Sequence, residues 1–203
     1  MTDVWSPLGA AGGVTVHDAL TAAQFATLPL ATPYQERAVL DVAGHRVELA
    51  WRASRELVAT LVTDGERRDV ASGRLEAQDS GSFAWSFHAM PLVVAGEPVT
   101  VERRRRDAVR WELRVEGPEG RRWTWRSAGL AWTGRMELVR AGERRALVTH
   151  QVHAGFAQVQ PLEATWTAQA SLGEVLMPVM WVLDRAYRGL LPKSQAIARG
   201  EVF

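Results

Sequence analysis

The spacing of apolar and polar residues changes from a period of two to a helical period near the end of the chain. Between residues 38 and 168, apolar side chains repeatedly occupy every second position; Trp111 and Leu113, for example, alternate with Arg110 and Glu112. Such alternation is typical of strands with one buried face. Gly-containing turns separate these segments, which predicts roughly ten to twelve short antiparallel strands.

The residue pattern in the last part of the chain, from Ser171 onward, predicts a helix. Ser171 and Glu174 have the spacing of a capping box, and the stretch from Val175 to Leu183 is apolar on every side apart from Pro178. A helix that is apolar all round must be surrounded by protein or lipid, and this stretch is about half as long as a membrane span. We expect it to pack in or against the sheet. Pro178 predicts a kink or a late start of the helix, because proline has no amide hydrogen to donate.

Together these patterns predict a mainly β fold in one domain. We expect an antiparallel β-barrel, or a strongly curled sheet of about 10–12 strands, around or against the hydrophobic C-terminal helix. Residues 1–35 form an N-terminal arm in which residues 17–28 suit a short helix. Residues 36–170 form the barrel, residues 171–191 the helix and residues 192–203 a tail.

The order of these elements resembles the tubby C-terminal-like group, which includes the LURP-one-related proteins and the phospholipid scramblases. The likeness covers about residues 36–190 and includes the string LEATWTAQASLGEVLMPVMWVLDRAY, in which a Trp-bearing last strand leads into the helix. In that group a twelve-stranded barrel is threaded by a hydrophobic C-terminal helix. The resemblance implies lipid association or another interaction role rather than catalysis. Pro178 departs from the group's uninterrupted helix, and its lipid-binding lysines have no match here.

Composition narrows the function classes. The formal net charge is +1, so no global charge attracts nucleic acid, and the absence of cysteine excludes disulfides and thiolate chemistry. Lys193 is the only lysine among 24 basic residues, which indicates the codon usage of a GC-rich, bacterial genome. The N-terminus lacks the pattern of a secretory signal, and no segment is long enough to span a membrane. We therefore expect a soluble, cytoplasmic protein.

Paired arginines at turns are candidates for anion binding, because a guanidinium group can grip a phosphate through two hydrogen bonds. The alternative is that they are solvated hairpin tips balanced by neighbouring acids. The candidate binding residues are Arg67, Arg68, Arg104, Arg106, Arg121, Arg122, Arg144 and Arg145.

Aromatic residues give a second candidate site. Most tryptophans share the apolar face of their strands, which favours a role in the core. If the helix packs outside the barrel, four aromatic residues could instead line a pocket for a small apolar ligand: Phe83, Trp85, Trp123 and Trp125.

No string typical of an active site occurs, and no cofactor is expected. His150 and His153 point to opposite faces of a strand, so no metal site is predicted. The sequence thus favours a non-enzymatic barrel that binds a lipid, a membrane surface or a protein. The alternative is a lipocalin-like carrier or enzyme that holds a small apolar ligand inside the barrel.

Overall fold

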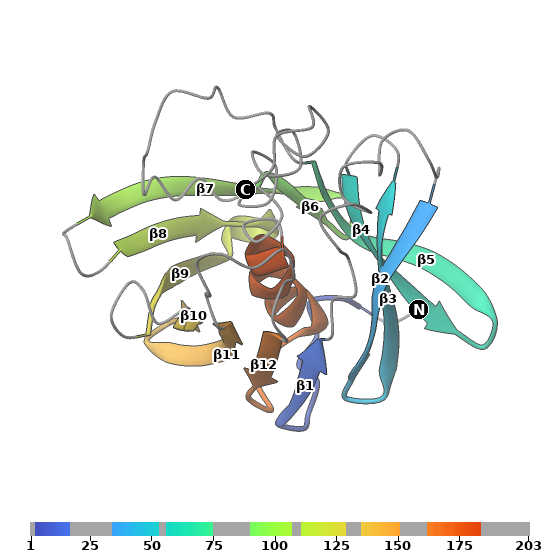
Figure 1. Ribbon diagram of the computed structural model, residues 1–203. Coiled ribbons are helices and arrows are strands. Elements are labelled where there is room, and N and C mark those ends of the chain that lie inside the picture. The colour runs from blue at the N-terminus through green and yellow to red at the C-terminus, as the bar shows by residue number, and fades with distance from the viewer. Residues whose placement is uncertain are drawn as a thin grey trace, which may run out of the picture.

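The protein folds as a nearly closed, mainly antiparallel β-barrel with one C-terminal helix packed against the sheet (Figure 1). The computed structural model describes residues 3–16, 34–52, 56–74, 90–106, 111–128, 135–150 and 162–183. The predicted fold class is confirmed.

Twelve described strands form one sheet, in the order β1-β12-β11-β10-β9-β8-β7-β6-β5-β4-β3-β2. From β2 to β12, each strand pairs antiparallel with the next strand along the chain, and β1 pairs with β12. The two edge strands, β1 and β2, come within 8 Å of each other between Cα atoms, so the sheet nearly closes. The strands are β1 (Gly12–Val16), β2 (Tyr34–Val42), β3 (His45–Arg52), β4 (Glu56–Thr63), β5 (Glu66–Arg74), β6 (Leu92–Val94), β7 (Glu97–Arg106), β8 (Trp111–Glu116), β9 (Arg122–Ser127), β10 (Arg135–Arg140), β11 (Glu143–His150) and β12 (Leu162–Trp166).

Four hairpins share the same two-residue turn, in which both central residues have a positive φ. These turns are Ala43-Gly44, Asp64-Gly65, Ala95-Gly96 and Ala141-Gly142. A turn of this type matches the right-handed twist of the flanking strands. Pro98 follows the Ala95-Gly96 turn and lies in β7, opposite Val93, since proline cannot adopt the positive φ of the turn residues.

The C-terminal helix, described over residues 172–183, occupies the middle of the curled sheet (Figure 1). Every residue from 171 to 183 is buried. Trp181 donates a hydrogen bond of 2.9 Å from Nε1 to the carbonyl oxygen of Met90, and its ring centre lies 4.5 Å from that of Trp125. The helix is therefore buried along its described length, and Trp181 contacts the barrel wall at Trp125. In the described part of the chain, no helix is long and apolar enough to cross a membrane.

Pro178 does not delay the start of the helix, which begins at Leu172 and continues through Pro178 to Leu183. The missing amide hydrogen at Pro178 removes the bond that would reach the carbonyl of Glu174. Met177 and Val179 on either side are fully buried, and this packing offsets the lost hydrogen bond.

The N-terminal residues differ from the expected arm. Residues 12–16 form β1, and the segment before it is held to the helix entrance by backbone hydrogen bonds, from Leu8 to Ala170 and from Gly173 to Val4. β1 is short and begins with two glycines, so its pattern is too weak to predict from sequence. The expected helix at residues 17–28 lies outside the described residues.

Candidate functional site

One end of the barrel carries the turns β2–β3, β4–β5, β6–β7, β8–β9 and β10–β11. Consecutive antiparallel strands place every second connection at the same end of a sheet. The link from β12 to the helix, residues 167–171, lies at this end too. We call it the hairpin end.

The hairpin end gathers three of the four predicted arginine clusters. These clusters are Arg67 with Arg68, Arg121 with Arg122, and Arg144 with Arg145. β7 runs away from the hairpin end, so its last residues, including Arg104 and Arg106, lie at the opposite end. The side chains of these last two residues are outside the described part of the structure.

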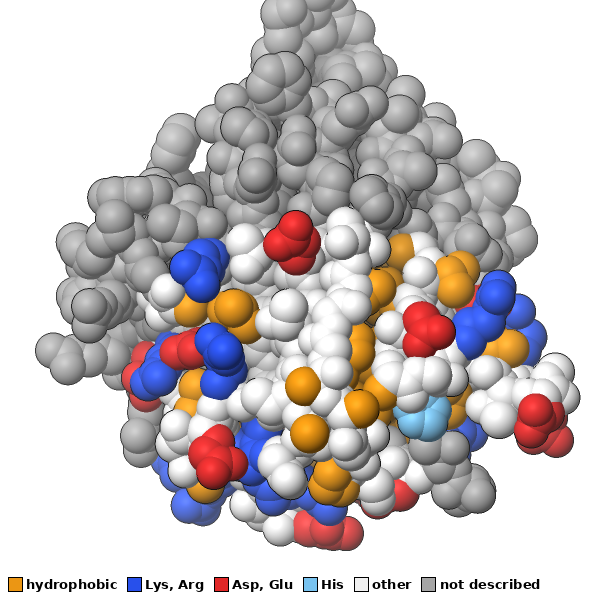
Figure 2. Space-filling view, turned by 90° about the horizontal axis from the view of Figure 1, so that it is seen from below, with side chains coloured by type: hydrophobic (Ala, Val, Ile, Leu, Met, Phe, Trp, Pro, Cys, Tyr) orange, Lys and Arg blue, Asp and Glu red, His pale blue; other side chains and the backbone are white. Residues whose placement is uncertain are grey.

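Neighbouring acids pair with most of these guanidinium groups. The pairs are Arg67 with Glu48, Arg121 with Glu119 at 2.7 Å, Arg122 with Glu116 at 3.3 Å, and Arg145 with Glu143 at 3.5 Å. Figure 2 accordingly shows basic and acidic side chains close together on the face seen from below. The local charge is therefore mixed rather than of a single sign.

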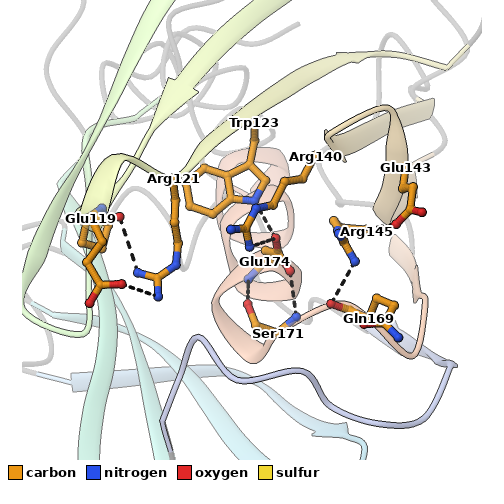
Figure 3. Close-up of polar contacts among 10 residues, drawn as sticks. Glu119, Arg121, Trp123, Arg140, Glu143, Arg145, Gln169, Ser171 and Glu174 are labelled. Atoms are coloured by element: carbon orange, nitrogen blue, oxygen red, sulfur yellow. Dashed lines mark hydrogen bonds and ion pairs between the residues drawn. The ribbon is translucent and has the colours of Figure 1, made fainter.

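The paired arginines differ in accessibility. The Arg145 side chain is only 14% exposed and also donates from Nη1 to the carbonyl oxygen of Gln169, so it ties β11 to the link before the helix (Figure 3). The Arg122 side chain is 67% exposed, and Arg144 is exposed as well. Arg122 and Arg144 are thus available to an external partner.

A buried carboxylate lies beneath this surface (Figure 3). Glu174, in the first turn of the helix, accepts hydrogen bonds from the Trp123 indole at 2.6 Å and from the Ser171 amide at 2.9 Å. Its own amide donates to the Ser171 hydroxyl at 3.2 Å, which confirms the predicted capping box. Arg140 lies 3.8 Å from the same carboxylate. These contacts satisfy Glu174 internally, which favours a structural role for it.

Two stacked tryptophans join the N-terminal segment to this cluster. The ring centres of Trp5 and Trp123 lie 5.5 Å apart, and the guanidinium groups of Arg121 and Arg140 lie over Trp5 and Trp123 at 5.4 and 5.8 Å. Cations over indole faces are attracted by the ring quadrupole. Trp5 carries no sequence signal, because it precedes the first segment with a regular alternation of apolar residues.

Asp3 fixes the turn that presents Trp5. Its carboxylate accepts a hydrogen bond from the Trp5 amide at 3.0 Å and another from the Ser6 hydroxyl at 2.9 Å. The bond from the Trp5 amide, followed by that from Ser6 and the nearby charge of Arg121, lowers the pKa of Asp3 below its ordinary value of 3.8.

Two of the four residues of the predicted aromatic pocket, Trp123 and Trp125, pack on the helix. Trp123 bonds to Glu174 and Trp125 lies against Trp181, so both indoles pack on the helix rather than line a cavity. Phe83 and Trp85 lie outside the described residues. The carrier hypothesis required a helix outside the barrel, and the described residues do not meet that condition.

The outer surface of the described residues includes the following two hollows. One, of about 250 Å³, lies between the β8–β9 and β10–β11 hairpins. The other, of about 540 Å³, lies over β5, β6 and β7 and includes the exposed Val93. The described residues contain no group of three or more acidic or histidine side chains able to hold a metal ion. The His150 side chain and His153 are not among them.

Comparisons with protein-family models, with curated proteins and with solved structures found no match to this chain.

Proposed function

We propose that this protein is a non-enzymatic binding barrel whose hairpin end docks on an anionic membrane surface. The observation that carries the proposal is the gathering of three arginine-bearing turns at one end of the barrel. Arg122 and Arg144 reach from two adjacent hairpins and are exposed, as contact with lipid headgroups requires. Each basic residue near an anionic surface contributes about 1 kcal/mol to the attraction.

The packed interior supports a role at the surface. The helix fills the centre of the barrel with buried apolar side chains, so a ligand is more readily bound outside it. The resemblance to the tubby C-terminal-like group points in the same direction and stays a prediction. A protein partner is the alternative that a negative membrane test would favour.

Vesicle co-sedimentation tests this proposal. The protein should pellet with phosphatidylcholine vesicles that contain an anionic lipid, should not pellet with phosphatidylcholine alone, and should be released as the salt concentration rises. The double variant Arg122→Gln/Arg144→Gln should bind the anionic vesicles more weakly, because two exposed cations are lost at the hairpin end.

A matched control removes the same charge elsewhere. Arg74 and Arg135 are exposed and lie at the opposite end of the barrel, at the last residue of β5 and the first of β10. Arg74→Gln/Arg135→Gln should therefore bind like the wild type. Equal loss in both double variants would indicate unspecific attraction, and no binding at low salt would contradict the proposal.

A further inference from the structure

The hollow between the β8–β9 and β10–β11 hairpins has the features of an oxyanion site. Its volume is about 250 Å³, and its lining includes Arg114, Arg122, Thr124, Val139 and the turn residue Gly142. Arg114 and Thr124 are cross-strand neighbours on β8 and β9, as are Glu116 and Arg122. These four side chains therefore form one square on the outer face of the sheet.

This square holds more positive than negative charge. The Nε atoms of Arg114 and Arg122 each lie 3.3 Å from the same carboxylate oxygen of Glu116. One carboxylate cannot neutralise two guanidinium groups, so a net charge of about +1 remains. Contact through Nε also leaves the Nη groups of each arginine available to a second partner.

The backbone opens the hollow. Pairing between β9 and β10 ends at Thr124 and Val139, next to a register shift between Leu138 and Val139 on the β11 side of β10. Beyond this bulge the β10–β11 hairpin diverges from β9, and the end of β9 at Arg122 has no partner on that side among the described pairs. Bulges of this kind commonly redirect side chains at functional sites.

We infer that this hollow binds a phosphate-type oxyanion through Arg114, Arg122 and the hydroxyl of Thr124. Two guanidinium forks and one hydroxyl offer the donors that a tetrahedral phosphate accepts, and arginine grips such groups bidentately. The inference rests on the proposed function, because both assign an anionic ligand to this part of the barrel. It adds a defined pocket and a class of ligand. A lipid headgroup or a free phosphate ester could equally supply the phosphate that the pocket binds.

The next arginine along β9 on the same face, Arg126, does not compete for this role. Arg126, two residues beyond Thr124 on β9, donates from Nε to Glu137 at 2.7 Å. It is thus matched by its own acid and lies outside the lining of the hollow. Arg126 therefore provides a control, because it carries the same charge as Arg122 and lies on the same strand, β9.

Titration of the full chain with inorganic phosphate, followed by NMR, tests the pocket. The backbone amides of Thr124 and Gly142 should shift. Arg114→Gln should weaken binding roughly tenfold or more, since a charge-assisted contact is lost. Thr124→Val keeps the shape of the side chain and should weaken binding about threefold through loss of the hydroxyl. Arg126→Gln should leave the affinity within about twofold of the wild type.

Denaturation curves of each variant distinguish lost binding from lost folding, and Thr124→Val keeps the test valid if Arg114→Gln does not fold. Shifts elsewhere on the barrel, or unchanged affinity in both pocket variants, would overturn the inference.

Vesicles containing phosphatidic acid distinguish a lipid headgroup from a free phosphate ester as the ligand. Phosphate binding here without vesicle binding supports the pocket and refutes the membrane role. Vesicle binding that is unaffected by Arg114→Gln and Thr124→Val, together with no phosphate binding in the hollow, refutes the pocket and leaves the proposed function standing.

Discussion

The indole Nε1 of Trp123 donates a hydrogen bond of 2.6 Å to Oε1 of the buried Glu174. Trp123 lies on β9 and Glu174 in the first turn of the helix, so this bond joins the barrel wall to the core element. The same carboxylate accepts the Ser171 amide through Oε2. One side chain thus caps the helix and fixes it in the barrel.

Glu174→Ala should destabilise the fold by about 2–4 kcal/mol, because it leaves the buried indole and amide donors without their acceptor. Glu174→Gln should cost less, since the amide oxygen can still accept from Trp123. Urea denaturation measures both. Glu163 is exposed on β12, and Glu163→Gln should change the free energy of unfolding by less than about 0.5 kcal/mol. Equal effects of Glu174→Ala and this control would refute the role of Glu174.

Gly173→Ala should lower the free energy of unfolding by about 1–3 kcal/mol. Alanine is normally favoured over glycine in a helix by up to about 1 kcal/mol, so the expected sign is the reverse of the usual one. The reason is that a Cβ at Gly173 would lie 2.8 Å from the Trp5 ring. The substitution should become neutral or stabilising in the Trp5→Ala background. A destabilisation that persists there would show that contact with Trp5 is not its cause.

Ala43→Asn should stabilise the protein by about 0.5–1 kcal/mol, because Ala43 has a φ of 53° that asparagine tolerates better than alanine does. Thermal or chemical denaturation measures the gain. Gly44→Ala in the same turn should cost about 1 kcal/mol, since Gly44 has a φ of 79°. No atom lies within 4 Å of a Cβ there, so that cost is conformational rather than steric. A loss of stability in Ala43→Asn would contradict the turn assignment.

Asp3 should make stability depend on pH at the acidic end of the range. Its pKa in the folded protein is below 3.8, so the ionised carboxylate stabilises the fold above that value. The contribution should disappear as the pH falls from 3.8 through the lowered pKa. The difference in free energy of unfolding between the wild type and Asp3→Asn measures the contribution of Asp3, because the contributions of the other titrating groups are the same in both proteins and cancel. A difference that grows below pH 3.8 would have the wrong sign.

Much of the fold was predictable because its signals are local. Strand alternation, the Gly-containing turns and the apolar stretch after Ser171 each depend on residues within one element, and the structure confirms the barrel and its helix. The Ser171–Glu174 capping box is local in the same way, and its two hydrogen bonds are present. Trp51, Trp125 and Trp166 are buried, which agrees with their positions on the apolar face of their strands.

Less of the candidate site could be predicted. The sequence identified Arg122 but gave no reason to single out Arg114, because an arginine on the polar face of a strand is unremarkable by itself. Their shared contact with Glu116 depends on the register between β8 and β9. A period of two fixes which face a side chain occupies and leaves open which residue lies opposite it.

The spacing of neighbouring residues was sufficient to predict most strands, most of the turns, the buried helix and its cap. The tertiary structure was needed to show that Trp5 stacks on Trp123, that Trp123 bonds to Glu174 and that three arginine-bearing turns share one end. Those contacts join distant parts of the chain. They depend on strand order, register and the curvature that nearly closes the barrel, and none of these is encoded in the spacing of residues within a single element.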